Sequence, residues 1–245
     1  MPPLRGNCPL FCQPLCLAAI FYPDDRHVGL ALFDLDNTLI GGDSDYLWGC
    51  FLAEQGIVDG AHYERENQRF YDQYRAGELD IHEFLRFQLK PLAEHDMPTL
   101  RQWRCAYIEE KVRPILLPLA HSLLDEHRAR GDIVVIITAT NSFITRPIAD
   151  LYGVEYLLAT EPEIIDDRYT GNVRGVPCFQ HGKVEKLGDW LKTNDVDLED
   201  SCFYSDSHND LPLLNQVARP VAVDPDDILH QHAVAHDWRI MSLRS

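Results

Sequence analysis

The chain has 245 residues and a formal net charge of −17 at pH 7, with 45% hydrophobic and 25% charged residues. This is the composition of an ordinary globular protein, long enough for one domain with an insert. The negative charge disfavours nucleic acid and anionic membranes as partners, because both would repel the chain. It leaves room for an anionic small substrate, since a metal ion and one or two cationic side chains can reverse the field locally.

The cysteine pattern bears on metal binding and on the cellular compartment. Seven cysteines are present without a C-x-x-C pair, at Cys8, Cys12, Cys16, Cys50, Cys105, Cys178 and Cys202. This pattern argues against a zinc ribbon and against a dithiol redox site. Reduced thiols in a cytoplasmic protein are the simplest interpretation.

The first 27 residues differ in character from the rest. They contain an apolar segment at 9–22, but Gln13 and Pro14 interrupt it, and no small-residue cleavage site follows. The segment is also too short to cross a bilayer. We therefore interpret residues 1–27 as a loosely ordered N-terminal extension and not as a secretory signal.

The first regular element expected is the apolar run 28–33, which reads as a buried strand ending at Asp34 and Asp36. Alternation along a strand places these two carboxylates on one side. Two negative charges at such a short distance repel each other unless a cation or a shared proton neutralises them. A site made of oxygen ligands alone favours Mg²⁺ as that cation. A lone D-x-D pair is also typical of a solvated turn. Crevices at strand carboxyl ends, however, are where open α/β sheets bind ligands, so we expect a site here.

Residues 46–114 have helical spacing throughout and no strand pattern, which predicts a small helical domain inserted after the first strand. Within this insert, Asp80 can cap a helix that runs to about residue 92. Thr99 can begin another helix, which ends before Pro114. We interpret its aromatic residues as the core of the insert, with one or two facing a cleft: Tyr46, Trp48, Phe51, Phe70, Tyr71 and Tyr74.

From residue 115 onward the pattern alternates between strands and helices. Strands are expected at 133–137, 155–159, 201–205 and, as the last one, 220–223. Helices are expected at 119–130, closed by Gly131, and at 142–152, 183–191 and 211–217, with a small hairpin at 164–173. This alternation predicts an α/β core with a parallel sheet, formed by residues 28–45 and 115–245.

Polar clusters follow three of these strands: Asp34 with Asp36, residues 138–141, and residues 206–210. In a parallel sheet the carboxyl ends share one edge, so the clusters can converge there. Lys183 begins a helix shortly before the third cluster. Carboxylates, hydroxyls, an amide and an amine supply what phosphoryl transfer needs, namely a metal site, a cation and an oxygen nucleophile.

Four motifs resemble those of the haloacid dehalogenase superfamily of phosphohydrolases. They are DLDNT at 34–38, the strand ending at Thr138, Lys183 within GKVEK, and SDSHNDLPLL at 205–214. The helical insert is similar to the first cap type of that superfamily, as in its phosphoserine-phosphatase-like branch. The resemblance covers about residues 28–223 and implies a Rossmann-like core with a helical cap.

The resemblance implies a role for each matching residue in phosphate-ester hydrolysis. Asp34 would be the nucleophile that forms an aspartyl-phosphate, and Asp36 would act as acid and then as base. Mg²⁺ would be held by the Asp34 and Asp206 side chains and by the backbone carbonyl of Asp36. Lys183 would neutralise the phosphate and the nucleophile, and Asp210 would orient Lys183 or a metal-bound water.

The same resemblance assigns the remaining contacts. Thr138 and Ala139 would bind phosphate, and Asn209 would contact the substrate. Thr38 would support the turn after the nucleophile.

Considered singly, some of these residues have simpler interpretations. Lys183 could be a solvated lysine at a helix start, and Asp206 or Asp210 could cap the helix that begins at residue 211. His208 is interpreted as a rim residue and not as a metal ligand, because oxygen ligands already account for the ion.

Two positions depart from the phosphoserine phosphatase pattern. Asp43 stands where that branch has a glutamate for the substrate ammonium, and Gln88 stands where it has an arginine for the substrate carboxylate. An amide cannot provide that charge pairing, and Arg86 would lie on a different helix face. An amine-bearing phosphomonoester without a carboxylate therefore fits better. Histidinol phosphate is one candidate, because GGDSD and the last motif resemble bacterial proteins assigned to that step.

Other functions remain open at this point. Phosphoserine is the alternative substrate, and a phosphotransferase or mutase would use Asp34 in the same way but pass the phosphoryl group to a second substrate. A non-catalytic binding module is disfavoured by the presence of all four motifs. We expect a small phosphorylated metabolite as partner and a monomer or homodimer.

Overall fold

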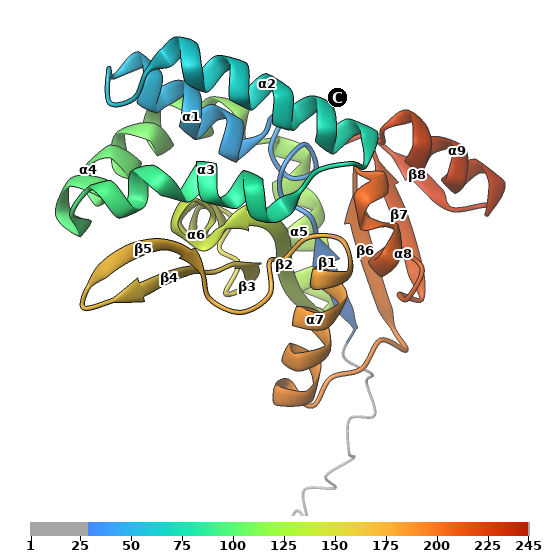
Figure 1. Ribbon diagram of the computed structural model, residues 1–245. Coiled ribbons are helices and arrows are strands. Elements are labelled where there is room, and N and C mark those ends of the chain that lie inside the picture. The colour runs from blue at the N-terminus through green and yellow to red at the C-terminus, as the bar shows by residue number, and fades with distance from the viewer. Residues whose placement is uncertain (1–28, 245) are drawn as a thin grey trace, which may run out of the picture.

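The computed structural model describes residues 29–244 (Figure 1). The interpretation of residues 1–27 as an extension, and with it Cys8, Cys12 and Cys16, therefore lies outside the described residues. Within that described part, no helix combines the length and the apolar character that a membrane span requires.

A six-stranded sheet forms the centre of the molecule. Its strands are β1 (Leu30–Phe33), β2 (Ile133–Asn141), β3 (Tyr156–Thr160), β6 (Ser201–Ser205), β7 (Arg219–Val223) and β8 (Arg239–Met241). All neighbours are parallel, in the order β3-β2-β1-β6-β7-β8. β1 pairs with β2 on one side and with β6 on the other. The strands that follow β1 are therefore added first toward one edge of the sheet and then, from β6 onward, toward the other edge. Open α/β sheets bind ligands at such a switch point.

Helices cover both faces of the sheet, which explains why the central strands are apolar along their whole length. Alternate residues of β1 point to opposite faces, Ala31 and Phe33 to one, Leu30 and Leu32 to the other, and all four are buried. The first face packs on α5 (Pro118–Arg130) and α6 (Ser142–Leu151). The second packs on α7 (His181–Asn194), α8 (Leu211–Leu214) and α9 (Asp227–Ala235).

The helical insert lies between β1 and β2 in the sequence. It contains α1 (Ser44–Glu54), α2 (Gly60–Ala76), α3 (Ile81–Glu94) and α4 (Met97–Tyr107), followed by a π-helical turn at Ile108–Val112 and a 3₁₀ turn at Arg113–Ile115. In Figure 1, α2 and α3 lie above the sheet. The hairpin of β4 (Pro162–Ile165) and β5 (Arg168–Val173) packs against α3. The predicted α/β core with an inserted helical cap is thereby confirmed.

Aspartates begin all four helices of the insert. Each side chain accepts hydrogen bonds from main-chain N–H groups of the first turn, at Asp43, Asp59, Asp80 and Asp96. Such caps satisfy donors that have no partner within the helix. Asp80 caps α3 as predicted. The helix expected to begin at Thr99 begins earlier, at Met97, because Asp96 is the cap and Thr99 supplies the N–H that it accepts.

The prediction that 220–223 is the last strand is wrong, because α9 and β8 follow it. Both elements leave little pattern in the sequence. Of the residues in α9, only Leu229 and Ala233 are buried. The edge strand β8 has three residues, of which Arg239 and Ile240 are exposed, so it lacks the apolar run that marks the inner strands.

Candidate active site

Lys183 joins two of the predicted acids beneath the carboxyl end of β1. Its Nζ lies 2.7 Å from Asp34 Oδ1 and 2.7 Å from Asp210 Oδ2. Ser205 Oγ, at the end of β6, donates to the same Asp210 oxygen at 2.7 Å. All four residues are buried. The structure thus brings the first motif, the Lys183 helix and the last motif together at one edge of the sheet, as the topology predicts.

The electrostatics of this group favour a charged lysine. Burial alone would lower the pKa of Lys183, but Asp210 and Asp34 outweigh that effect, and the pKa is raised. Burial raises the pKa of Asp34 to about 7, with repulsion from Asp210 and Asp36 adding to the rise and Lys183 opposing it. One ammonium therefore serves more acids than it can neutralise.

The start of α7 positions Lys183 through close backbone packing. A Cβ atom on Gly182 would lie 1.9 Å from the carbonyl oxygen of Pro177, so no side chain fits there. Gln180, with φ of 47°, begins this turn, and its Nε2 donates to Asn209 Oδ1 at 2.8 Å. Glycine at 182 therefore allows α7 to begin close enough for Lys183 to reach Asp34.

Thr38 connects the first motif to the last. Its Oγ1 lies 3.4 Å from Asp34 Oδ2 and 3.2 Å from Asp206 Oδ1, so its one proton can be donated to either, and it accepts from the Asp206 main-chain N–H at 3.1 Å. Burial, followed by repulsion from Asp34 and Asp210, raises the pKa of Asp206 well above its usual value. Thr38 thus holds two carboxylates near a common point.

The Asp36 side chain accepts hydrogen bonds from the start of α1 and from the carboxyl end of β2. Its Oδ1 accepts from the Ser44 N–H at 2.6 Å, and its Oδ2 accepts from Thr140 Oγ1 at 2.9 Å and Thr138 Oγ1 at 3.5 Å. Burial and then the nearby Asp43 raise the pKa of Asp36 to about 6, against the effect of the hydrogen bonds from Ser44 and Thr140. Such an environment keeps a proton available to Asp36 near neutral pH.

The donor chemistry fits a hard divalent cation. The expected ligands are the carboxylates of Asp34 and Asp206 and the carbonyl oxygen of Asp36, all oxygen donors. Between residues 29 and 244, no group of three or more His, Cys, Asp or Glu side chains is arranged to hold a metal ion. A site with two carboxylates and a carbonyl agrees with that finding, because Mg²⁺ keeps several waters and uses few protein ligands.

A cavity of about 80 Å³ separates this acid cluster from the helical cap. Its charged lining residues are all acidic: Asp36, Asp43, Asp45 and Asp206. Among the described residues that line it, none is Lys, Arg or His. Beyond the reach of Lys183, the cavity therefore suits a cationic or neutral group better than an anionic one.

Aromatic residues contribute more to this cavity than the sequence indicated. Trp48 and Phe51 are buried in the core of the cap, as expected. The other four rings expected in that core line the cavity instead: Tyr46, Phe70, Tyr71 and Tyr74. The helical spacing of α1 and α2 predicts a shared face but not whether that face meets another helix or a hollow.

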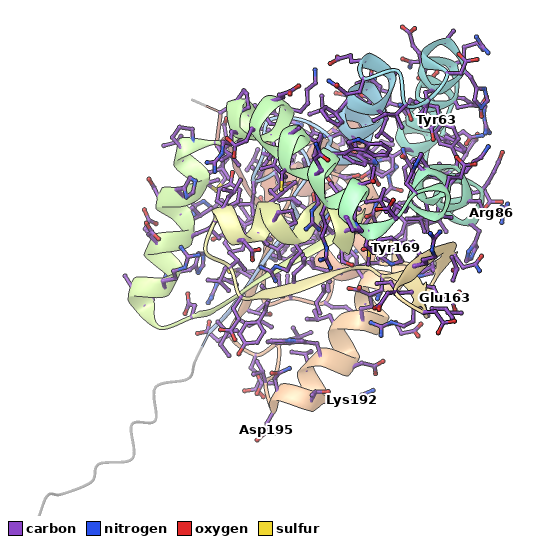
Figure 2. All side chains as sticks on the ribbon, turned by 90° about the vertical axis from the view of Figure 1, so that its left-hand side faces the viewer. Tyr63, Arg86, Glu163, Tyr169, Lys192 and Asp195 are labelled. Atoms are coloured by element: carbon purple, nitrogen blue, oxygen red, sulfur yellow. The ribbon has the colours of Figure 1, made fainter. Side chains whose placement is uncertain are left out.

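The predicted substrate residues differ in where they lie. Ala139, Asp43 and Gln88 line the cavity, although Asp43 also caps α1 by accepting from the Tyr46 N–H at 2.8 Å. Asn209 does not line it, and its amide donates to the carbonyl oxygen of Tyr74 at 3.1 Å. Arg86 is exposed at the outer margin of the molecule (Figure 2), away from the cavity.

Several residues near the site were missed by the sequence analysis. Asp45 is 4% exposed, its Oδ1 accepts from Asn141 Nδ2 at 3.2 Å, and burial followed by Asp43 and Asp36 raises its pKa well above the usual value. The second acid of GGDSD could have signalled it. The motif resemblance named Thr138 and not Thr140 as a site residue, although Thr140 makes the shorter hydrogen bond to Asp36.

Tyr74 joins the cap to the loop that carries the last motif. Its Oη donates to Ser207 Oγ at 2.9 Å, and its carbonyl oxygen accepts from Asn209. Ser207 and not Asp206 caps the 3₁₀ turn at 208–210, and Asp210 stands at the N-cap position of α8 without a side-chain capping bond. His208 instead binds Asp226, with Nδ1 2.7 Å from Oδ2.

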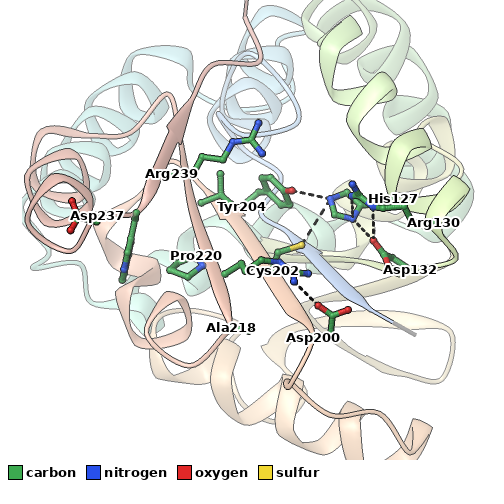
Figure 3. A pocket seen from close by; sticks show the side chains of 13 residues that line it. His127, Arg130, Asp132, Asp200, Cys202, Tyr204, Ala218, Pro220, Asp237 and Arg239 are labelled. Carbon is green, nitrogen blue, oxygen red and sulfur yellow. Dashed lines mark hydrogen bonds and ion pairs between the residues drawn. The ribbon is translucent and has the colours of Figure 1, made fainter. Parts of the chain in front are cut away.

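A larger hollow of about 710 Å³ lies elsewhere, over β6, β7 and β8 (Figure 3). Its wall includes a buried network in which His127 Nδ1 lies 2.7 Å from Asp132 Oδ2 and Nε2 lies 2.9 Å from Tyr204 Oη. Burial lowers the pKa of His127. None of the predicted site residues lines this hollow, so its size does not make it the site.

Comparison with known proteins agrees with this geometry. The model of the haloacid dehalogenase-like hydrolase family matches residues 31–215. A protein named histidinol-phosphatase from Neisseria meningitidis serogroup C (strain 8013) is 40% identical over 88% of this chain and 99% of its own length.

Two solved structures extend the comparison. A protein of unknown function from Bordetella pertussis Tohama I is 43% identical over 87% of this chain and 98% of that one, with a TM-score of 0.82. A phosphoserine phosphatase, solved as a phospho-aspartyl intermediate analogue, has a TM-score of 0.67 at 21% identity over 89% of this chain and 94% of its own, which supports the fold alone.

Fold, site and relatives together define an enzyme of the phosphatase class, which hydrolyses phosphate monoesters. A parallel sheet with buried acids and a lysine at its switch point, covered by helices, is the arrangement observed. The chain belongs to the haloacid dehalogenase-like hydrolase family.

Proposed function

We propose that this enzyme is a Mg²⁺-dependent phosphatase that acts through an aspartyl-phosphate on a small amine-bearing metabolite, with histidinol phosphate as its substrate. The observation that carries the proposal is the cavity beside Asp36 and Asp206, whose lining has acids and aromatic rings and no basic residue among those described. The relative from Neisseria that is named for histidinol phosphate supports the same substrate. Helices within residues 46–114 serve as the cap over that cavity.

In the proposed reaction, a carboxylate oxygen of Asp34 attacks phosphorus, and the bond from phosphorus to the leaving alcohol breaks. Asp36 gives its proton to the leaving oxygen, and its pKa of about 6 suits that transfer. Asp36 then takes a proton from water, which attacks the aspartyl-phosphate, releases inorganic phosphate and restores Asp34. Lys183, held by Asp210, neutralises charge on the phosphoryl oxygens throughout.

Asp34, Asp206 and the carbonyl oxygen of Asp36 would hold Mg²⁺, which when bound supplies positive charge for the phosphoryl oxygens. Side chains of the protein balance the remaining charge and hold the carboxylates in place. Thr38 keeps the two carboxylates near each other, and Lys183 remains on the opposite oxygen of Asp34.

The substrate amine would meet Asp43 and Asp45, two acids on the cavity wall. A substrate carboxylate would meet the same acids and find no cation among the described lining residues, which disfavours phosphoserine. Gln88 cannot replace the missing cation, because an amide carries no charge. Charge complementarity therefore favours an amine-bearing phosphomonoester without a carboxylate.

A panel of phosphate esters tests this proposal. With Mg²⁺ and no added acceptor, we expect inorganic phosphate release from histidinol phosphate with a kcat/KM roughly 100-fold above that for phosphoserine, because an unpaired carboxylate in an acidic cavity costs several kcal/mol. Equal values for the two substrates would contradict the charge argument. Consumption of the ester only when a second alcohol is added, with the phosphoryl group recovered on that alcohol and not as inorganic phosphate, would instead indicate a phosphotransferase.

Removal of divalent cations tests the proposed metal requirement. After treatment with a chelator and desalting, we expect phosphate release to fall by roughly 100-fold or more, because one lysine is left to offset the acids and the phosphate. Adding Mg²⁺ should restore the rate, whereas adding Na⁺ at equal ionic strength should not. Full activity of enzyme shown by elemental analysis to lack metal would rule out the proposed cofactor.

A further inference from the structure

Two buried amides lie in the cap wall of the active-site cavity, Asn67 on α2 and Gln88 on α3. They are 5% and 2% exposed. Gln88 Nε2 lies 3.5 Å from Asn67 Oδ1, at the outer limit of a hydrogen bond. Within residues 29–244, no further hydrogen bond is formed by either amide group. Neither residue is among those with a fully enclosed polar atom that lacks a partner, so the free amide atoms are accessible to a ligand in the cavity that both residues line.

The chemistry of the pair defines what would satisfy it. When the NH2 group of one amide points at the oxygen of the other, one whole NH2 group and one whole carbonyl oxygen of the pair have no partner, whichever way each amide is turned. A carboxylate can only accept and an ammonium can only donate, so each would leave one of the two unpaired. A neutral azole ring has one N–H donor and one nitrogen acceptor and can satisfy both.

The surroundings of the pair suit a flat ring. Phe70 and Phe84 also line the cavity, with their ring centroids 5.3 Å apart and the rings nearly perpendicular. Aromatic side chains in such edge-to-face arrangements accept a further ring with favourable geometry. The acids that would hold an ammonium, Asp43 and Asp45, lie on α1 and the turn before it, in another wall of the same cavity.

Gly49 on α1 fixes the position of Asn67. A Cβ atom at residue 49 would lie 2.6 Å from Asn67 Nδ2, which is closer than real contacts allow. The absence of a side chain at Gly49 therefore gives the Asn67 amide its place. Substitution there offers a way to displace the amide without removing it.

We propose that Asn67 and Gln88 form a specificity subsite that binds a neutral azole ring at the end of the substrate distant from the phosphate. This inference rests on the proposed function, because it concerns the same cavity and the same amine-bearing substrate. The subsite adds two residues that distinguish a substrate with a ring from shorter amines. Asp34 and Lys183 would act in the same way on both kinds of substrate.

The test compares histidinol phosphate with phosphoethanolamine, which has the amine but no ring. In Asn67→Leu and in Gln88→Leu, the ratio of kcat/KM for the first substrate to that for the second should fall by roughly 10-fold to 100-fold, because buried hydrogen bonds to the ring are lost. Gly49→Ala should lower the same ratio by a smaller factor. Gln68→Leu is the matched control, since Gln68 is the next residue of α2, exposed, and bonded to Asp72.

A measurement on the unaltered enzyme covers the case in which the leucine variants do not fold. Histidinol should inhibit at least about tenfold more tightly than 2-amino-1-propanol, its analogue without the ring. Equal inhibition by the two alcohols, or an unchanged kcat/KM ratio in folded variants, would overturn the subsite while leaving the phosphatase proposal intact. A wild-type enzyme that does not prefer histidinol phosphate to phosphoserine would overturn both.

Discussion

Replacing Asp34 by Asn should abolish phosphate release, with a fall in kcat of roughly 10⁴-fold or more, as expected when a nucleophile is removed. An amide nitrogen or oxygen cannot form the acyl phosphate, whereas the side chain keeps its size and its place beside Thr38. Lys183 keeps its contact with Asp210, so the site should stay assembled. The measurement is inorganic phosphate release from histidinol phosphate and from p-nitrophenyl phosphate, both with Mg²⁺.

The matched control for this variant is Asp59→Asn. Asp59 caps α2 by accepting from the His62 N–H at 3.1 Å, and asparagine caps helices about as well as aspartate. The control should retain the wild-type rate and melting temperature. Turnover by Asp34→Asn within tenfold of the wild type would show that another residue takes the phosphoryl group.

Replacing Lys183 by Met should reduce both stability and activity. The change leaves Asp34 and Asp210 buried without their cation, and breaking one partner of a buried ion pair costs about 3–5 kcal/mol. Loss of the charge that neutralises the phosphoryl oxygens should lower kcat by roughly 100-fold or more. Urea unfolding monitored by circular dichroism gives the stability, and phosphate release gives the rate.

Two further variants separate these effects. Lys192→Met, on the exposed end of the same helix, should change stability by less than about 0.5 kcal/mol, because its ion pair with Asp189 is solvated. Adding Asp210→Leu to Lys183→Met should recover part of the lost stability but none of the activity. A Lys183→Met protein as stable as the wild type would mean that the two acids are neutralised in another way.

The core of the fold is predictable because its central strands are buried on both faces. The runs that become β1 and β2 are continuously apolar, and each ends at polar residues that mark the ligand edge. The elements that escaped prediction, α9 and β8, bury few residues and occupy one end of the sheet. Their placement depends on pairing with β7, which no local pattern encodes.

The acids and the lysine of the site were predictable for the same topological reason. Asp34, Asp206 and Asp210 follow strand ends, and parallel pairing alone brings such ends together. The cavity wall was not predictable in this way. Asn67 stands in a polar stretch of α2 whose neighbours face solvent, and its burial follows from how α1, α2 and α3 meet.

The contacts of Tyr74 have a consequence for the timing of turnover. A hollow of about 80 Å³ is far below the roughly 300–1,000 Å³ of ligand sites in general, so we expect the helices of the cap to move when a substrate binds. Lifting α2 must break the hydrogen bonds of Tyr74 with Ser207 and Asn209, which border the phosphoryl-binding acids. If the proposed aspartyl-phosphate forms, weakening these hydrogen bonds should speed the release of phosphate but expose the intermediate to water earlier, so faster turnover would come at the cost of a less protected intermediate.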